Sequence, residues 1–312
     1  MEGNVYPLID YFNSRGHELD SSNTEALNHV WEGSIEVFKS GPMFHPKKCL
    51  SLDALLLGDP DSQEVFLPSA REEVAGIASQ LLGHRESSIS VGPLDLMLHA
   101  HTKPIRAGIR IDSADNNIEG KIYLKIFDPT RVFGIQLYNL LAGIGVDYHF
   151  VTDDELTVEE EVGGNHLFDL EDSKRSSLNR SPLFTSQRIA LDSYRINLGF
   201  GDLVKEDNFV VSEGGMIRVI DFDILIHPTY HEIERIKSKT TEGMGVFRAF
   251  YDSVFEEQTK LILLNYQKNK REVDLLLNAY ASFDSFCKSQ AQTIFGFLNS
   301  KRKVLNTSGG LD

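Results

Sequence analysis

The sequence predicts an α+β protein, with an antiparallel sheet in one lobe, a helical second lobe and a helical extension before them. Strand patterns gather between residues 88 and 162, and helical patterns fill the chain on both sides of them. Strands and helices do not alternate as they do in the βαβ units of a doubly wound sheet, which argues against that class. The chain has 312 residues, 41% of them hydrophobic, which is enough to bury a core in one large domain or in two lobes.

Residues 1–87 are predicted to form a helical extension packed on the sheet lobe. The first helix lies in EALNHVWEGSIEVFKS, where apolar residues recur at helical spacing. The second lies in SAREEVAGIASQLLG, where Ser69 is the expected N-cap, Glu72 its capping-box partner and Gly83 the stop.

Residues 88–162 are predicted to form the sheet lobe. Gly, Pro, Asp and Asn separate four strands, SISVG, DLMLHAH, RAGIRID and GKIYLKIFD. One helix follows them, TRVFGIQLYNLLAGIG, and two strands near DYHFV and ELTVEEEV complete the lobe.

Residues 163–305 are predicted to form the helical lobe. After Gly163 and Gly164, the stretch SPLFTSQRIALDSYRINLG predicts a long helix, and a short β-hairpin follows it. From about residue 230 the chain is predicted to be helical to its end. Residues 306–312 are polar and Gly-rich, which predicts either a linker to a downstream domain of a longer protein or a frayed terminus.

Charge and cysteine content exclude several classes of function. The formal net charge of −15 opposes binding to nucleic acid and to anionic membranes unless a local basic patch offsets it. Cys49 and Cys287 give neither a disulfide framework nor zinc-ligand spacing, and they indicate a reducing compartment. The sequence shows no targeting segment and no apolar run of the ~18 residues that a membrane span needs. We therefore expect a cytosolic protein without a transmembrane span and without a nucleic-acid partner.

Three polar residues surround the predicted hairpin in GFGDLVKEDNFVVSEGGMIRVIDFD, residues 199–223. Asp202 precedes it, Asn208 lies at its start and Asp221 directly follows its second strand. Mg²⁺ takes oxygen ligands and accepts only one or two from a protein beside phosphates and water. Asn208 and Asp221 can supply these ligands, and Asp202 can accept the proton of an attacking hydroxyl. The pattern therefore predicts a phosphotransfer site, although a surface hairpin with solvated acids stays an alternative.

The hairpin segment resembles the catalytic loop and metal motif of the protein-kinase-like superfamily, in its atypical branch with Gly-Asp and Asp-Phe-Asp. The resemblance implies a bilobal protein-kinase-like fold, with Asp202 as the catalytic base and Asn208 and Asp221 as ligands of Mg²⁺ or Mn²⁺. KIYLKIFDP resembles the strand that presents the ATP-contacting lysine, here Lys125. LTVEEEVGGNHLFDL resembles the hinge that binds adenine. Val158 is then expected behind the base, with the acids from Glu159 to Glu161, Glu160 among them, on the connecting strand.

The sequence departs from the family pattern in several places. Asp202 and Asn208 are six residues apart where the family has five, and no Gly-x-Gly-x-x-Gly loop precedes Lys125. The stretch HAHTK, with His99, His101 and Lys103, is one candidate for the missing phosphate contacts. The helix after Lys125 offers no glutamate to pair with it, so Glu72, Glu73 and Asp128 stay open as partners.

The residues after the metal motif bear on the substrate. His227, Arg235, Lys237 and Lys239 form a local cationic cluster that can complement an anionic head group. The chain is similar in character to bacterial effector lipid kinases. That resemblance implies a phosphoinositide-containing membrane surface as partner and secretion into a host cell. It also implies transfer of the ATP γ-phosphate to the 4-hydroxyl of phosphatidylinositol 3-phosphate. An atypical protein Ser/Thr kinase, a pseudokinase scaffold and transfer of another ATP moiety stay open as alternatives.

Overall fold

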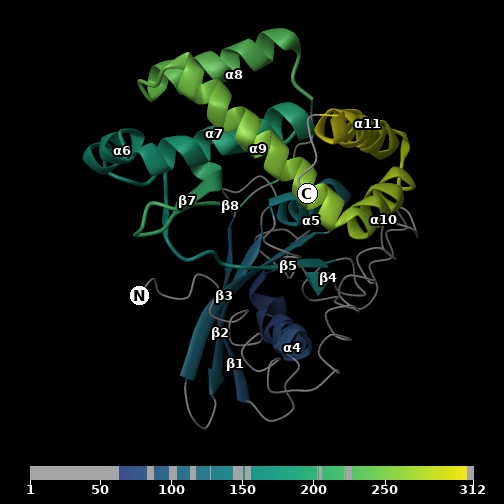
Figure 1. Ribbon diagram of the computed structural model, residues 1–312. Helices are drawn as coiled ribbons and strands as arrows, with labels where there is room; N and C mark the ends of the chain where they lie inside the picture. Colours follow the sequence, from purple (N-terminus) through teal and green to yellow (C-terminus); the bar gives the residue numbers. More distant parts are fainter. Residues whose placement is uncertain are drawn as a thin grey trace. The chain divides into compact units, whose positions relative to one another are not determined.

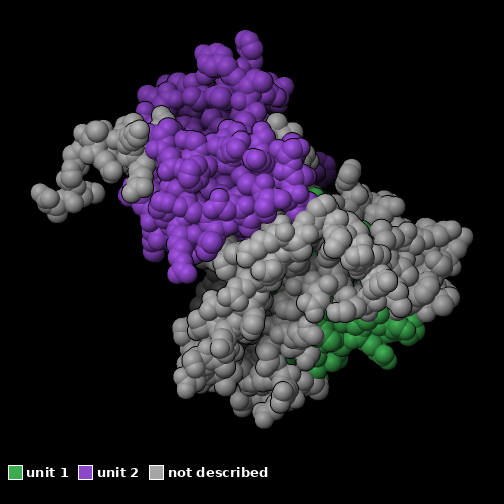
Figure 2. Space-filling model, turned by 90° about the vertical axis from the view of Figure 1, so that its right-hand side faces the viewer, with its two compact units in different colours: residues 1, 3–128, 148–163 green, residues 2, 129–147, 164–312 purple. Residues whose placement is uncertain are grey.

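The fold is that of a computed structural model. It describes residues 63–82, 88–97, 104–112, 117–126, 128–142, 150–151, 156–201, 203, 206–220, 222 and 227–307. The chain divides into two units, which Figure 2 colours separately. The first contains residues 3–128 and 148–163, and the second contains residues 129–147 and 164–312. The predicted mixture of an antiparallel sheet with many helices is confirmed.

The first unit contains a five-stranded antiparallel sheet (Figure 1). Its strands pair in the order β1-β2-β3-β5-β4. Their bounds are Ser88–Leu96 for β1, Ile105–Asp112 for β2, Asn117–Ile126 for β3, Phe150–Val151 for β4 and Leu156–Glu160 for β5. The predicted strands in this part of the chain are therefore present, with one exception.

The exception is β1, where the sequence predicts two strands, SISVG and DLMLHAH. The structure instead has one strand through Gly92 and Pro93, with a register irregularity between Val91 and Leu94. Pro93 lacks the N–H that a regular ladder needs, and the irregularity lets the strand continue past it. Met97 N–H then donates to the Pro104 carbonyl at 3.0 Å. Residues 98–101 of the predicted second strand lie outside the described residues.

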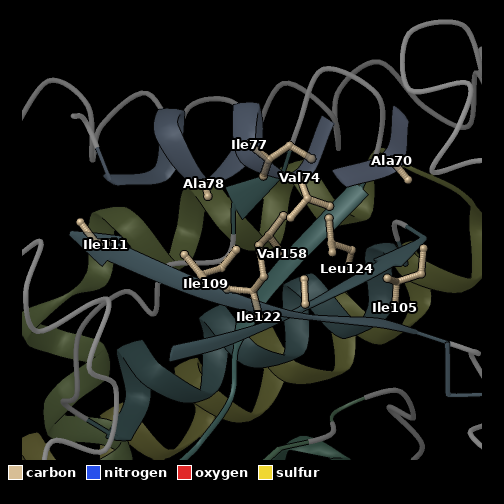
Figure 3. Close-up of a cluster of buried hydrophobic side chains, with 11 residues drawn as sticks. Ala70, Val74, Ile77, Ala78, Ile105, Ile109, Ile111, Ile122, Leu124 and Val158 are labelled. Atoms are coloured by element: carbon tan, nitrogen blue, oxygen red, sulfur yellow. The ribbon is translucent and has the colours of Figure 1, made fainter. Parts of the chain in front are cut away.

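The core of the first unit lies between the sheet and helix α4, Gln63–Leu82 (Figure 3). Alternate residues of β2 and β3 point to the helix because side chains alternate across a strand. The sheet contributes Ile105, Ala107, Ile109, Ile111, Ile122, Leu124 and Val158, and α4 contributes Ala70, Val74, Ile77 and Ala78. This apolar face leaves the opposite face of the sheet for polar side chains.

Helix α4 begins earlier than the sequence predicts. Ser69 is an interior residue of α4 and not its N-cap, because the helix starts at Gln63 and continues through Pro68. Pro68 lacks only one N–H near the start of a 20-residue helix, and the packed residues that follow offset that loss. The helix ends at Leu82, directly before the predicted stop at Gly83. The helix predicted in EALNHVWEGSIEVFKS lies outside the described residues.

The second unit consists mainly of helices (Figure 1). Helix α7 confirms its predicted ends, because the Ser181 hydroxyl accepts from Phe184 N–H and Gly199 closes the helix at φ 82°, where glycine is favoured. The chain after residue 230, predicted to be helical to its end, includes a break at residues 282–284, which separates two helices. The helices are α5 Pro129–Ala142, α6 Asp172–Asn179, α7 Pro182–Leu198, α8 Tyr230–Gly243, α9 Arg248–Lys268, α10 Lys270–Ala281 and α11 Ser285–Thr307.

A small three-stranded sheet completes the second unit. It has the order β6-β7-β8, with β6 Asn165–His166, β7 Phe209–Val211 and β8 Ile217–Val219. A 3-10 turn, Glu206–Asn208, leads directly into β7. The predicted hairpin is therefore present, whereas β6 and the polar helix α6 were not predicted.

Buried polar contacts join three helices of this unit. The Asp192 carboxylate of α7 accepts hydrogen bonds from Thr240 of α8 at 2.7 Å and from Tyr251 of α9 at 3.0 Å. Burial raises the pKa of Asp192 to about 6.

Among the residues that the structure describes, no helix combines the length and apolar character that crossing a membrane requires.

Candidate functional site

Lys125 lies near the end of β3 and forms a buried ion pair. Its Nζ is 2.9 Å from Glu159 Oε2, and each side chain is only 11% exposed. Lys125 is opposite Thr157 in the register, and Tyr123 is opposite Glu159. Lys125 and Glu159 are therefore diagonal neighbours on one face of the sheet, within reach of long side chains. Leu124 and Val158 point to the other face, into the core.

Glu159 is the partner of Lys125 that sequence reasoning missed. The sequence offered Glu72, Glu73 and Asp128 as candidates. In the structure Lys125 pairs instead with Glu159 of the neighbouring strand β5. The signal was available, because opposite charges two strand positions apart in register lie on the same face. A buried lysine on a strand needs such a carboxylate, since an unpaired charge in a low-dielectric interior is costly.

The same face of the sheet continues as a ladder of polar pairs. Lys121 Nζ is 2.8 Å from Glu161, and the Tyr123 hydroxyl donates to Glu161 at 3.0 Å. Burial and the Glu161 carboxylate raise the pKa of Tyr123 to about 12. Lys121 is 50% exposed, against 11% for Lys125. The ion pair of Lys125 is thus the sheltered end of this ladder, where an electrostatic interaction is stronger than in water.

Val158 and Glu160 of the predicted hinge lie on β5. The Val158 side chain is 1% exposed and packs under α4 (Figure 3), on the side away from Lys125. Glu160 is buried and pairs in register with Ile122. The strand ends here, with Glu161 N–H donating to the Lys121 carbonyl at 2.7 Å.

Asn208 lies at the base of the β7–β8 hairpin. It is 7% exposed, and its carbonyl accepts from Ile220 N–H at 3.0 Å. This bond closes the hairpin one residue beyond the last strand pair, Phe209 with Val219. The predicted ligand Asp221 follows Ile220 in the sequence, but Asp221 and the predicted base Asp202 both lie outside the described residues.

Aromatic residues join the segments that contain these two aspartates. Phe200 precedes Asp202 by two positions and Phe222 directly follows Asp221. Their rings are 5.8 Å apart and nearly perpendicular. Tyr138 of α5 packs on Phe222 with ring centroids 5.1 Å apart. At Gly134 of α5, an added Cβ would lie 3.1 Å from Phe222 Cβ and 3.2 Å from its carbonyl oxygen. A side chain at this position would therefore require the loop to move away by a few tenths of an ångström.

The sequence matches no model of a protein family and no curated protein. The kinase resemblance therefore stays a prediction, which rests on the residues of the chain itself.

The predicted cationic cluster is only partly available to an anion. Arg235 and Lys239 are exposed on α8, whereas the Lys237 ammonium lies 5.4 Å from the centre of the Phe255 ring of α9. Burial lowers the pKa of His227, which disfavours the charged imidazole. Glu232, Glu234 and Glu242 match the three cations of α8, so the helix has no net charge.

Of the two predicted metal ligands, Asn208 lies among the described residues and Asp221 does not. Within those ranges, no group of three or more His, Cys, Asp and Glu side chains is placed to hold a metal ion. Asn208 fits the predicted role by its chemistry, because an amide oxygen is a ligand that Mg²⁺ accepts. His99, His101 and Lys103 lie outside the described residues. In the sequence they lie between β1 and β2. Leu96, at the end of β1, pairs in register with Ile105, at the start of β2, and Ile105 pairs in register with Leu124 of β3.

Proposed function

We propose that the protein is an ATP- and Mg²⁺-dependent phosphotransferase with the bilobal protein-kinase-like fold. One observation carries the proposal most directly. The segments before Asp202 and after Asp221 pack together through Phe200 and Phe222, and Ile220 is hydrogen-bonded to Asn208. These contacts within residues 200–222 support the proposal, because they hold the segments next to the two proposed aspartates against the base of the hairpin. A solvated surface hairpin would have no need of a buried aromatic cluster at its base.

Lys125 supports the proposal independently. Protein kinases hold the phosphates of ATP with a lysine on the third strand of their sheet, paired to a glutamate. Lys125 lies on the third strand and pairs with Glu159, although that glutamate comes from β5 and not from a helix. In the proposed enzyme Lys125 binds phosphate oxygens, and Glu159 orients the ammonium.

The other roles follow from the chemistry of each residue. Asn208 and Asp221 hold the divalent cation, which neutralises charge on the transferred phosphoryl group when it is bound. Asp202 orients the acceptor hydroxyl and takes its proton. These roles need rigid placement, which the hairpin ladder and the buried rings of Phe200 and Phe222 favour.

The proposed acceptor is an inositol hydroxyl of a phosphoinositide, and specifically the 4-hydroxyl of phosphatidylinositol 3-phosphate. Exposed Arg235 and Lys239 support it, since cations near the site bind an anionic head group. The balanced charge of α8 favours the second candidate, a Ser or Thr side chain of a protein, because a neutral helix gives no attraction to a membrane surface.

A mixed-substrate assay tests the function and its acceptor together. The full chain is incubated with γ-labelled ATP, Mg²⁺, phosphoinositide vesicles and a generic protein substrate, and the products are separated by thin-layer chromatography and gel. We expect label in lipid, lost by Asp221→Ala because metal binding is removed. Label only in protein would replace the lipid by the second candidate. ATP and Mg²⁺ binding without transfer to either acceptor would make the protein a pseudokinase scaffold, and full activity of Asp221→Ala would contradict the site.

A further inference from the structure

The β7–β8 hairpin is too short to hold its own geometry. Its ladder has three register pairs, from Phe209 with Val219 to Val211 with Ile217. The five residues 212–216 connect the two strands, and within this loop Gly215 N–H donates to the Ser212 carbonyl and Gly215 has a φ of 79°. An isolated two-stranded hairpin is marginally stable in water, so contacts from outside must fix this one.

Helix α7 supplies such a contact at the turn. The Gln187 amide nitrogen donates to the Gly215 carbonyl at 3.0 Å, and the Gln187 amide oxygen accepts from Ile217 N–H at 2.8 Å. β8 is an edge strand of the described sheet. Gln187 therefore takes the place of a further strand at this edge, because it satisfies one acceptor and one donor with a single planar group.

The next residue of α7 contacts the other end of β7. The Arg188 guanidinium lies over the Phe209 ring, with Cζ 4.7 Å from the centroid. Phe209 directly follows Asn208. Consecutive residues of one helix thus hold the turn and the base of the hairpin, although only Gln187 does so through paired hydrogen bonds.

We propose that Gln187 is a positioning residue of the proposed phosphotransferase. Its side-chain amide fixes the turn of the hairpin, and through the three-residue ladder it fixes the end that contains Asn208. In this role Gln187 acts through the hairpin and not by contact with substrate. The inference rests on the proposed function, because the position of the hairpin affects phosphotransfer only through the proposed metal site at its base.

The test compares two glutamines of the full chain that each make a contact between elements. Gln187→Met keeps the length of the side chain and removes both hydrogen bonds to the turn. Gln258→Met is the matched control, because Gln258 of α9 donates to the Tyr194 hydroxyl at 3.1 Å and, among the described residues, makes no contact with the hairpin. Gln187→Glu is a second variant, which keeps an acceptor for Ile217 N–H and sets a carboxylate oxygen against the Gly215 carbonyl. It keeps the inference testable should Gln187→Met fold poorly.

Two readouts are measured on each variant. Amide hydrogen exchange reports the hairpin directly, and we expect residues 209–220 to exchange about tenfold faster in both Gln187 variants, with no change in Gln258→Met. The Mg²⁺ concentration that gives half-maximal phosphotransfer should rise about tenfold in the Gln187 variants, as for residues that orient metal ligands, with the KM for ATP changed less.

The outcomes separate the inference from the proposed function. Faster exchange with an unchanged Mg²⁺ requirement would overturn the inference, because Gln187 would then be merely structural, and the proposed function would stand. Unchanged exchange would also overturn it. A wild-type chain without phosphotransfer would overturn the proposed function, and the positioning role would fall with it.

Discussion

At the scale of single residues, Asp192 shows how burial sets a proton equilibrium. Asp192 is 5% exposed, and its carboxylate lies among Thr240, Tyr251, Arg188 and Arg195. Burial raises its pKa from 3.8 to about 6, while the hydroxyl donors and the two arginines oppose that rise. The native chain therefore binds a proton more tightly than the unfolded chain does between these values. The stabilisation of the folded chain by the protonated Asp192 is complete below about pH 4 and is lost as the pH rises through about 6.

We expect Asp192→Asn to remove this dependence. Asparagine keeps an acceptor oxygen for Thr240 and Tyr251 and is never ionised. The difference in the free energy of unfolding, variant minus wild type, should grow by up to about 3 kcal/mol between pH 4 and pH 7. Urea unfolding at a series of pH values measures it, and other titrating groups cancel in the difference. A difference that stays constant across this range would show that Asp192 is already ionised at pH 4.

At the scale of elements, the contact of α5 with the loop after β8 depends on Gly134. Alanine improves helix propensity by about 1 kcal/mol over glycine. At Gly134, however, the new methyl group would meet Phe222 Cβ and its carbonyl oxygen at 3.1 and 3.2 Å, so the loop must shift. Since Phe222 follows Asp221, such a shift should disturb the proposed metal site.

The matched pair is Gly134→Ala and Gly296→Ala, both in helices of the second unit. An added Cβ at Gly296 of α11 meets no atom within 4 Å. We expect Gly296→Ala to stabilise the chain by about 1 kcal/mol with unchanged phosphotransfer. Gly134→Ala should fail to gain that stability and should lose at least about tenfold in phosphotransfer. Equal stability gains and equal activities would show that the loop accommodates the methyl group freely.

Elements with strong local signals could be predicted from the sequence. Helix α7 has a capping serine, a proline at its first turn and a closing glycine, and its predicted ends are confirmed. Helix α6 has no buried residue, so its sequence lacks the apolar periodicity from which a helix is predicted. β6 is a two-residue strand whose pairing with β7 depends on tertiary contact. The start of α4 was missed because Pro68 and Ser69 imitate a helix start.

The candidate site was predictable only in part, because its contacts join distant residues. The hairpin with Asn208 follows from local turn chemistry and alternating apolar residues. The Lys125–Glu159 pair depends on the register of β3 with β5, which are separated by a helix and another strand. The packing of Phe200 on Phe222 and the hydrogen bonds of Gln187 have no local sequence signal.

At the scale of the whole molecule, charge bears on the choice of acceptor. The net charge of −15 repels an anionic membrane. A lipid acceptor therefore needs the exposed cations Arg235 and Lys239, and its phosphorylation should weaken as salt screens them. The proposed phosphate contact of Lys125 should depend less on salt, because salt screens a buried ion pair such as Lys125–Glu159 much less than exposed charges.

We propose that this chain transfers phosphate from ATP with Lys125 as a phosphate-binding residue. The most direct measurement is the rate of transfer from γ-labelled ATP by wild type, Lys125→Met and Lys121→Met. Lys121 is the matched control because it lies on the same strand and pairs with Glu161, but it is half exposed. Circular dichroism is used to check that each variant is folded. Should Lys125→Met fail to fold, the double variant with Glu159→Leu removes the uncompensated carboxylate.

We predict that wild type and Lys121→Met transfer phosphate at rates within about threefold of each other, because an exposed pair contributes little. Lys125→Met should lose about 100-fold or more, as expected when a preorganised charge is removed from a phosphoryl-transfer site. Equal rates for the two lysine variants would rule out phosphate binding by Lys125, and no transfer by the wild-type chain to any acceptor would rule out the phosphotransferase.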